Sequence, residues 1–237
     1  MSRTMMKKLI ILIPALNEET MLGNVLNDLK GSIVSFPKFG LETEIVVVDD
    51  GSTDLTSLVA DNAGATVLKH IINCGLGGAL GTGFEYARRN NADYLVTFDG
   101  DGQHDPNEME HLLRPLIEGK ADVVIGSRMI NSEGMPIDRI LLNKAANLVT
   151  FLLFGVKSSD TQSGYRSFNK LALSSISIKT RRMEVSSEIL AEVFSHKLRY
   201  IEVPIKAIYS DYSLTKGQQN INSILVFVKL LLRRIVK

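Results

Sequence analysis

Short runs of β-branched and apolar residues alternate with amphipathic stretches through the first 125 residues, and this alternation limits the possible folds. The runs are apolar on both faces, which is typical of parallel strands buried between two layers of helices. We expect strands at residues 8–13, 44–48, 66–69, 94–98 and 123–125, and helices at 18–29, 54–63, 77–90 and 106–118. The pattern predicts an α/β fold with a mostly parallel, Rossmann-like central sheet flanked by helices.

The second half of the chain has a different pattern. A loop at 131–136, a helix at 138–154, a polar segment at 158–164, helical spacing at 184–194 and a strand at 200–205 precede a polar stretch and a final helix. No linker rich in Gly, Ser and Pro divides the chain. We therefore expect one large domain over residues 1–220, followed by an amphipathic basic helix at 221–237.

Charge and composition exclude several classes of protein. The 27 Lys and Arg residues nearly cancel the 26 Asp and Glu residues, so no general affinity for nucleic acid is indicated. One cysteine, Cys74, cannot form an internal disulfide, and the apolar run behind the basic N-terminus is too short for a signal peptide. These features favour the cytoplasm.

The last fourteen residues, 224–237, are apolar with four cations. Such a segment suits a helix lying on the cytoplasmic face of a membrane, with its cations toward anionic headgroups. Packing against the domain or against a second copy is the alternative. No stretch reaches the roughly 18 uninterrupted apolar residues that a spanning helix needs. We expect a peripheral protein, or one that a separate membrane protein recruits.

Acidic loops follow three of the expected strands, at residues 14–19, 49–54 and 99–105. The carboxyl ends of parallel strands meet at one edge of a sheet, where ligands bind. Three acidic loops there would repel one another unless a positive charge lay between them. Asp99 and Asp101 flank a glycine and can direct two carboxylates at one point, which suits Mg²⁺ or Mn²⁺ bridging a diphosphate. Taken alone, Asp-x-Asp is also an ordinary turn.

Two further segments point to a nucleotide. A carboxylate at Asp49 or Asp50 can accept hydrogen bonds from a ribose hydroxyl or a base N–H, or it can form the turn; we expect each role for a different residue of this loop. The glycine-rich segment 73–83 matches neither G-x-G-x-x-G nor G-K-[ST], which excludes NAD and a P-loop. Its small residues either let a helix start close to a donor site or serve packing alone.

Six motifs together carry a family resemblance. They are IPALNEE at 13–19, VDDGSTD at 48–54, NCGLGGA at 73–79, DGDGQH at 99–104, GSR at 126–128 and SGYR at 163–166. With them, the chain from Ile10 to about Gly217 resembles the family 2 glycosyltransferases of GT-A fold, in particular the polyprenyl-phosphate (dolichyl-phosphate) mannosyl- and glucosyltransferases. The resemblance implies a nucleotide-sugar-binding half at 1–126 and an acceptor half at 127–220.

The resemblance also implies roles for the donor side of the site. The nucleotide-binding residues would be Pro14, Leu16, Glu18, Asp49, Asp50, Gly75 and Asp99. The metal, Mg²⁺ or Mn²⁺, would be held by Asp99, Asp101 and Gln103. Asp99, Asp101 and Arg128 would carry catalysis.

On the acceptor side, the resemblance implies a lipid phosphate whose charge arginines balance. The residues concerned are Arg128, Arg139, Asn143, Asp160, Arg166, Ser213 and Lys216. Arg has a planar fork that can bond two phosphate oxygens, although a solvated surface position is its commoner fate. Asp160 could belong to an ordinary polar loop, and Arg166 could equally brace a loop.

The reaction implied is direct, inverting displacement of a UDP or GDP leaving group from a hexose by polyprenyl or dolichyl phosphate. Such a phosphate is already ionised near neutral pH, so no strong general base is needed. Two alternatives stay open. One is transfer to a hydroxyl acceptor in cell-surface polysaccharide synthesis, and the other is a nucleotide-sugar-binding module without catalysis. His104 and Asp105 are expected to shape the loop and cap a helix.

Overall fold

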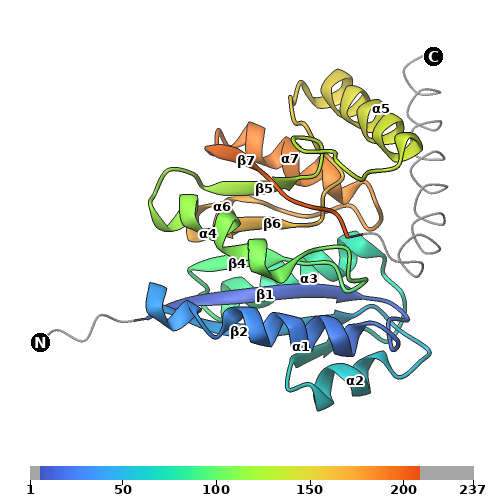
Figure 1. Cartoon of the computed structure of the whole chain (residues 1–237), viewed down its shortest axis with the longest axis vertical. Helices are drawn as coiled ribbons and strands as arrows, with labels where there is room; N and C mark the ends of the chain where they lie inside the picture. The colour runs from blue at the N-terminus through green and yellow to red at the C-terminus, as the bar shows by residue number, and fades with distance from the viewer. Residues whose placement is uncertain (1–5, 209–237) are drawn as a thin grey trace, which may run out of the picture.

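A seven-stranded sheet forms the centre of the molecule in a computed structural model that describes residues 6–208 (Figure 1). The strands are β1 (Lys7–Ala15), β2 (Leu41–Asp49), β3 (Thr66–Lys69), β4 (Tyr94–Thr97), β5 (Val123–Ser127), β6 (Arg166–Asn169) and β7 (Tyr200–Pro204). Their order across the sheet is β3-β2-β1-β4-β6-β5-β7. Only β6 runs antiparallel to its neighbours, so the prediction of a mostly parallel sheet is confirmed.

The helices are α1 (Leu22–Ile33), α2 (Thr56–Asn62), α3 (Leu76–Arg89), α4 (Met109–Ile117), α5 (Ile137–Phe154), α6 (Lys170–Ser175) and α7 (Val185–Ser195). Two short 3-10 helices, η1 (Phe36–Phe39) and η2 (Pro106–Glu108), precede β2 and α4. Among residues 6–208, no helix is both long enough and apolar enough to cross a membrane.

The sheet separates two apolar cores, and the alternation of β1 side chains explains them. Leu9, Ile11 and Ile13 face a core shared with α1, α2 and α4. Ile10 and Leu12 face the opposite core, which α3, α6 and α7 complete. Successive strand side chains point to opposite faces, so a strand covered on both faces must be apolar at every position. The continuous apolar run in this strand is the sequence signal for that arrangement.

The sequence did not predict β6, although it lies in the middle of the sheet. Arg166 and Ser167 give it a polar start, unlike the other central strands. The fold satisfies these polar groups internally: Ser167 Oγ donates to the carbonyl of Leu112 at 2.8 Å. A buried strand can therefore carry polar residues when tertiary partners surround it.

Helix starts also differ slightly from the prediction. The first helix begins at Leu22, not at 18, because residues 17–19 are hydrogen-bonded to the loop after β2. The expected cap at Asp105 is confirmed, since its side chain accepts from the backbone N–H of Asn107, with Pro106 at the first helical position. That turn is the 3-10 helix η2, which leads into α4.

Candidate functional site

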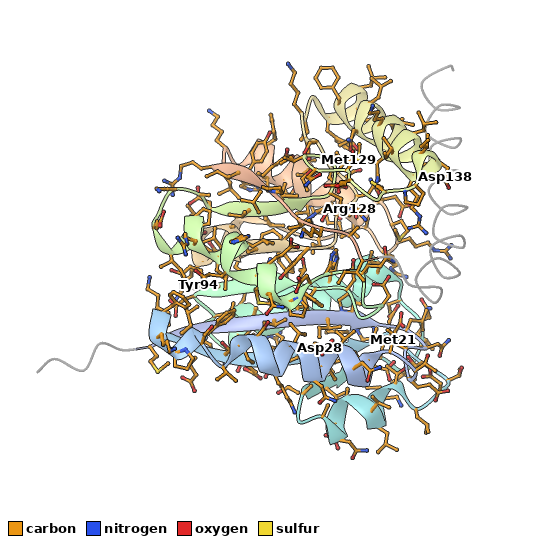
Figure 2. The ribbon with its side chains drawn as sticks, viewed as in Figure 1. Met21, Asp28, Tyr94, Arg128, Met129 and Asp138 are labelled. Carbon is orange, nitrogen blue, oxygen red and sulfur yellow. The ribbon has the colours of Figure 1, made fainter. Side chains whose placement is uncertain are left out.

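A cavity of about 490 Å³ opens at the carboxyl ends of β1, β2 and β4, between the sheet edge and α5. Figure 2 shows Arg128 in the loop after β5, between the sheet and α5, which begins near Asp138. The cavity brings together predicted residues from both halves of the chain. Those that line it are Pro14, Leu16, Glu18, Asp50, Gly75, Asp99, Asp101, Gln103, Arg128, Arg139 and Asn143.

Asp99 and Asp101 follow β4 and are held by two neighbours in their own loop. His104 Nε2 lies 2.9 Å from an Asp99 carboxylate oxygen. Gln103 donates to Asp101 twice, from its backbone N–H at 3.0 Å and from Nε2 at 2.6 Å. The imidazole of His104 packs against the rings of Phe98 and Tyr165, which also contact each other. The two carboxylates are therefore oriented by the fold.

Gly164 determines where the Asp99 carboxylate can lie. A Cβ at position 164 would come within 2.4 Å of both Asp99 carboxylate oxygens. The main chain at Gly164 is fixed in turn by Thr97, whose hydroxyl donates to its carbonyl at 2.6 Å. The segment 163–166 carries the motif SGYR, but nothing in the sequence indicates that its glycine makes room for the carboxylate of Asp99.

The two carboxyl groups differ in their electrostatics. Burial acts to raise the pKa of Asp99, but the hydrogen bond with His104 and the charges of Arg128 and Arg166 outweigh it and lower this pKa. Burial and the neighbouring charge of Asp99 raise the pKa of Asp101 above its usual value. Negative charge is thus crowded at Asp101, and a cation placed among these oxygens would relieve it.

This donor set fits a hard divalent cation. Asp99, Asp101 and Gln103 offer oxygen atoms and no sulfur, as Mg²⁺ and Mn²⁺ prefer. Gln103 is 9% exposed, and the hydrogen bond from its side-chain amide to Asp101 shows that the two side chains reach the same point of the cavity. The residues present are therefore compatible with the metal that the sequence predicted.

The loop after β2 divides the two roles expected of its acids. Asp50 lines the cavity and accepts from the backbone N–H groups of Cys74 at 2.8 Å and Gly75 at 2.7 Å. Asp49 does not line it. Its carboxylate accepts from the backbone N–H of Ser52 and from the hydroxyl of Ser57. In this structure the buried Asp49 forms the turn, and its assignment to nucleotide binding stays a prediction.

A network between two loops positions Glu18 at the rim of the cavity. The backbone N–H of Glu18 donates to Thr56 Oγ1 at 2.8 Å, and Asn17 Oδ1 accepts from the N–H of Thr53 at 3.0 Å. Asn17 adopts a positive φ of 52°, which Asn tolerates better than most residues. The acidic loops after β1 and β2 therefore form one unit.

The glycine-rich segment serves packing as well as access. Gly75 lines the cavity with φ 84°, and a Cβ there would come within 2.3 Å of the carbonyl oxygen of Arg181. The N–H of Gly77, in the first turn of α3, donates to that same carbonyl at 2.9 Å. The segment therefore does not serve packing alone: Gly75, Leu76 and Ala79 line the cavity, while Gly75 and Gly77 allow close contact with residues 180–181.

Arg128 is fixed by a buried partner. Its Nε and Nη2 donate to the two carboxylate oxygens of Asp160 at 2.8 and 2.9 Å, and its backbone N–H donates at 3.1 Å. The Asp160 side chain is 0% exposed and lies outside the cavity lining. In this structure Asp160 holds Arg128, which lines the cavity, and the assignment of Asp160 to the acceptor phosphate stays a prediction.

Arg166 braces the loop beneath the site. Its guanidinium is buried and donates to the carbonyl oxygens of Ser163, Thr161 and Ser186, at 2.8, 2.8 and 3.1 Å. Burial lowers the pKa of Arg166 to about 10, although Asp160 and Asp99 act to raise it. Arg166 does not line the cavity, and this arrangement agrees with the alternative that it braces a loop; its contact with a phosphate stays a prediction.

Arg139 and Asn143 lie on the side of α5 that faces the cavity, one turn apart. Ser213 and Lys216 lie outside the described residues. The sequence assigned no role to several other lining residues. Some lie inside the quoted motifs, namely Ala15, Asn17, Asn73, Leu76, Ala79, Gly100 and Gly164. The others lie outside the motifs and are Met135, Leu142, Gln162, Met183 and Ser186.

Comparison with known proteins gives concordant results. A family model described as "Glycosyl transferase family 2" matches residues 10–175. An N-acetylglucosaminyltransferase of Methanococcus voltae, named for UDP-N-acetylglucosamine and dolichyl phosphate, is 36% identical over 98% of each chain. An undecaprenyl-phosphate mannosyltransferase of Micrococcus luteus is 30% identical over 84% of this chain and 82% of its own. An uncharacterized protein of Methanocaldococcus jannaschii is 40% identical over 96% and 93%.

Solved structures agree on the fold. Glucosyl-3-phosphoglycerate synthase from Mycobacterium tuberculosis, in complex with phosphoglyceric acid, superposes with a TM-score of 0.68 and 21% identity. That match covers 95% of this chain and 80% of the other. A second structure of that enzyme, with Mn²⁺, UDP and glucosyl-3-phosphoglycerate, gives a TM-score of 0.64 at 21% identity, over 94% and 80% of the two chains. The GT-A fold expected from the sequence is thereby confirmed.

Proposed function

Because the chain belongs to glycosyl transferase family 2, we propose that it transfers a hexose from a nucleotide-diphosphate sugar to a polyprenyl phosphate. The relatives from Methanococcus voltae and Micrococcus luteus, which are named for dolichyl and undecaprenyl phosphate, support this acceptor. The reaction is placed at the cytoplasmic face of a membrane, because the donor is water-soluble and the acceptor is a lipid.

The observation that carries the proposal is that one cavity is lined by both acidic and basic side chains. Its lining includes the acids Glu18, Asp99 and Asp101 and the arginines Arg128 and Arg139. The acids fit a metal-bound diphosphate, and the arginines fit a second anion. A hydroxyl acceptor would need no such cations, so two anionic reactants fit this cavity best.

The donor side accounts for binding and for departure of the leaving group. Pro14, Leu16, Glu18 and Asp50, which line the cavity, would border the nucleoside. Asp101 and Gln103 would hold Mg²⁺ or Mn²⁺, and Asp99 would face the donor. The metal, when bound, neutralises charge that develops on the departing nucleotide diphosphate. His104 and Gly164 keep the Asp99 carboxylate in place.

On the acceptor side, Arg128 and Arg139 orient a phosphate oxygen toward the anomeric carbon. That oxygen supplies the electron pair of the new C–O bond, while the bond to the nucleotide diphosphate breaks and its electron pair leaves with the diphosphate. The configuration inverts in a single displacement. No proton has to be removed from the attacking phosphate, because it is already ionised at neutral pH.

A transfer assay tests the proposal. Full-length protein is incubated with radiolabelled UDP- and GDP-sugars, polyprenyl phosphate and Mg²⁺ or Mn²⁺, and the lipid is extracted into organic solvent. We expect label in the organic phase with one donor class, and none when EDTA is added. Label transferred only to a water-soluble polysaccharide acceptor would favour the hydroxyl alternative. Donor binding without any transfer would favour a non-catalytic module.

A further inference from the structure

Helix α5 carries its apolar side chains on the face that points to solvent. Ile137, Leu141, Leu148 and Leu152 are 76, 62, 58 and 62% exposed. At 3.6 residues per turn these four fall within an arc of about 60°. We call this face, together with Lys144 and Phe151 at its edge, the outer arc of α5. A helix that packs only on its own domain has the opposite polarity, with apolar residues inward.

The inner face of α5 carries polar as well as apolar residues. Ala146 and Val149 are buried there, and Asn143 and Thr150 are 8 and 2% exposed, with the hydroxyl oxygens of Thr150 and of Ser187 in α7 3.0 Å apart. Arg139, Leu142 and Asn143 line the cavity. One helix therefore presents polar groups to the site and apolar groups to solvent, so it forms the wall between the cavity and whatever covers the outer arc.

Charge identifies the occupant of the outer arc. Helix α5 has one acid, Asp138 in its first turn, and there is no Asp or Glu between residues 139 and 159. Lys144 and Lys157 carry positive charge in this stretch, while Arg139 faces the cavity. Lys157 Nζ lies 5.9 Å from the centre of the Phe151 ring, at the border of the apolar face. Lysines placed at the edge of an apolar surface suit a bilayer interface, where the stem is buried and the ammonium meets anionic headgroups.

We propose that the outer arc of α5 rests on an anionic bilayer and so presents the cavity to a membrane-borne phosphate. The inference rests on the proposed function for the nature of that acceptor. A second copy of this chain fits less well, because a two-fold contact would place the same cations opposite each other. Residues 224–237 also carry four cations and no acid, so they complement an anionic surface and not this arc.

Vesicle co-sedimentation tests the surface directly. Full-length protein is spun with vesicles of phosphatidylglycerol and phosphatidylcholine in equal amounts, and with phosphatidylcholine alone. We expect Leu141→Glu/Leu148→Glu to weaken binding to the anionic vesicles by about tenfold or more. The matched control is Leu58→Glu/Leu171→Glu, on α2 and α6, where exposure is 52 and 55%. Equal binding by wild type and both variants would overturn the proposal.

A fluorescent label separates a bilayer from other occupants. Cys74 is replaced by serine, and an environment-sensitive dye is attached through Leu148→Cys or, as control, Leu171→Cys. We expect the emission from position 148, and not from 171, to shift to shorter wavelength when anionic vesicles are added. Emission at 148 that is already short without vesicles would mean that a second copy or residues 209–237 cover the arc, and would overturn the proposal.

Activity measurements distinguish this inference from the proposed function. With a short-chain, water-soluble isoprenyl phosphate, Leu141→Glu/Leu148→Glu should retain wild-type transfer, while transfer to long-chain acceptor in vesicles should fall. Vesicle binding that depends on the outer arc, without transfer to any polyprenyl phosphate, would refute the function and keep the surface. Equal loss of transfer to both acceptors would place these leucines in the catalytic machinery and refute the surface.

Discussion

The carboxylate of Asp99 lies directly against the α-carbon of Gly164, where a Cβ would approach both of its oxygens to within 2.4 Å. The two residues are far apart in the chain and meet because β4 and β6 are neighbours in the sheet. His104, in the same loop as Asp99, holds this carboxylate as well. The position of the acid is therefore set by its own loop and by the segment that leads into β6.

Replacing Gly164 by alanine should reduce transfer strongly with little loss of folded protein. The added methyl displaces Asp99, and a shift of about 1 Å at a reacting centre can cost on the order of 100-fold in rate. Steady-state kinetics and circular dichroism measure the two effects. Gly31→Ala is the control, because its Cβ would have no neighbour within 4 Å. Wild-type turnover by Gly164→Ala would show that the position of Asp99 does not matter.

Asp101→Asn should lower transfer by about 100-fold or more, because a metal ligand and its charge are lost. The folded state should be no less stable without metal, since repulsion from Asp99 is relieved. Thermal melting with Mn²⁺ and UDP should show an increase in Tm for wild type and none for the variant. Asp28→Asn, on the exposed side of α1 (Figure 2), is the control. An equal increase in Tm for Asp101→Asn would remove Asp101 from the metal site.

Removing Arg128 should destabilise the protein, because Asp160 would remain buried without its bidentate partner. Arg128→Gln should lower the free energy of unfolding by about 3 kcal/mol in urea titrations. Arg128→Gln/Asp160→Asn should recover much of that loss, since no buried charge remains. Arg114→Gln, which breaks an exposed pair with Glu110, is the control and should change stability little. No difference between the single and double variants would mean that the pair is not coupled.

Arg139→Ala should act on the acceptor and not on the donor. Loss of one charge-assisted contact should raise KM for polyprenyl phosphate by about tenfold, with KM for the nucleotide sugar unchanged. Arg89→Ala, at a side chain that is 78% exposed on α3, is the control. The reverse pattern, with only the donor KM raised, would move Arg139 to the other half of the cavity.

The start of β5 should make stability sensitive to acid. Asp122 accepts from the N–H, Nε and Nη2 of Arg199, and these bonds lower its pKa from 3.8 to about 2. A carboxyl group whose pKa is lower in the folded state than in the unfolded state stabilises the fold at pH values above its unfolded-state pKa. That stabilisation is lost as the pH falls toward the folded-state pKa. Between about pH 5 and pH 2, the free energy of unfolding of wild type should therefore fall by about 2 kcal/mol through Asp122. The variant Asp122→Asn lacks this contribution at every pH.

Urea titrations at pH 7 and at about pH 2 measure this difference. The Asn variant should be less stable than wild type at pH 7, and the two should converge in acid. Glu42→Gln, at an exposed position on β2, should follow the wild-type profile. A constant gap between wild type and Asp122→Asn across the range would show that the carboxyl pKa is not lowered.

The sequence by itself determined the sheet and the edge at which the acids gather. Runs such as residues 9–13 are apolar at every position, and only a strand covered on both faces explains that pattern. The acids that follow β1, β2 and β4 then had to lie at the same edge, because parallel strands end together. These are local consequences of side-chain period and strand direction, so they can be read from adjacent residues.

Only the tertiary structure decided which polar residues face the cavity and which support it. Asp49 and Asp50 are adjacent, yet one forms a turn and the other lines the cavity. Arg128 directly follows β5 and Arg166 begins β6. Arg128 reaches the cavity, whereas Arg166 donates to main-chain carbonyls beneath it. Partners such as Asp160 and Gly164 lie more than thirty residues from the groups they position. A buried polar group takes its role from the partners that satisfy it, and packing alone selects those partners.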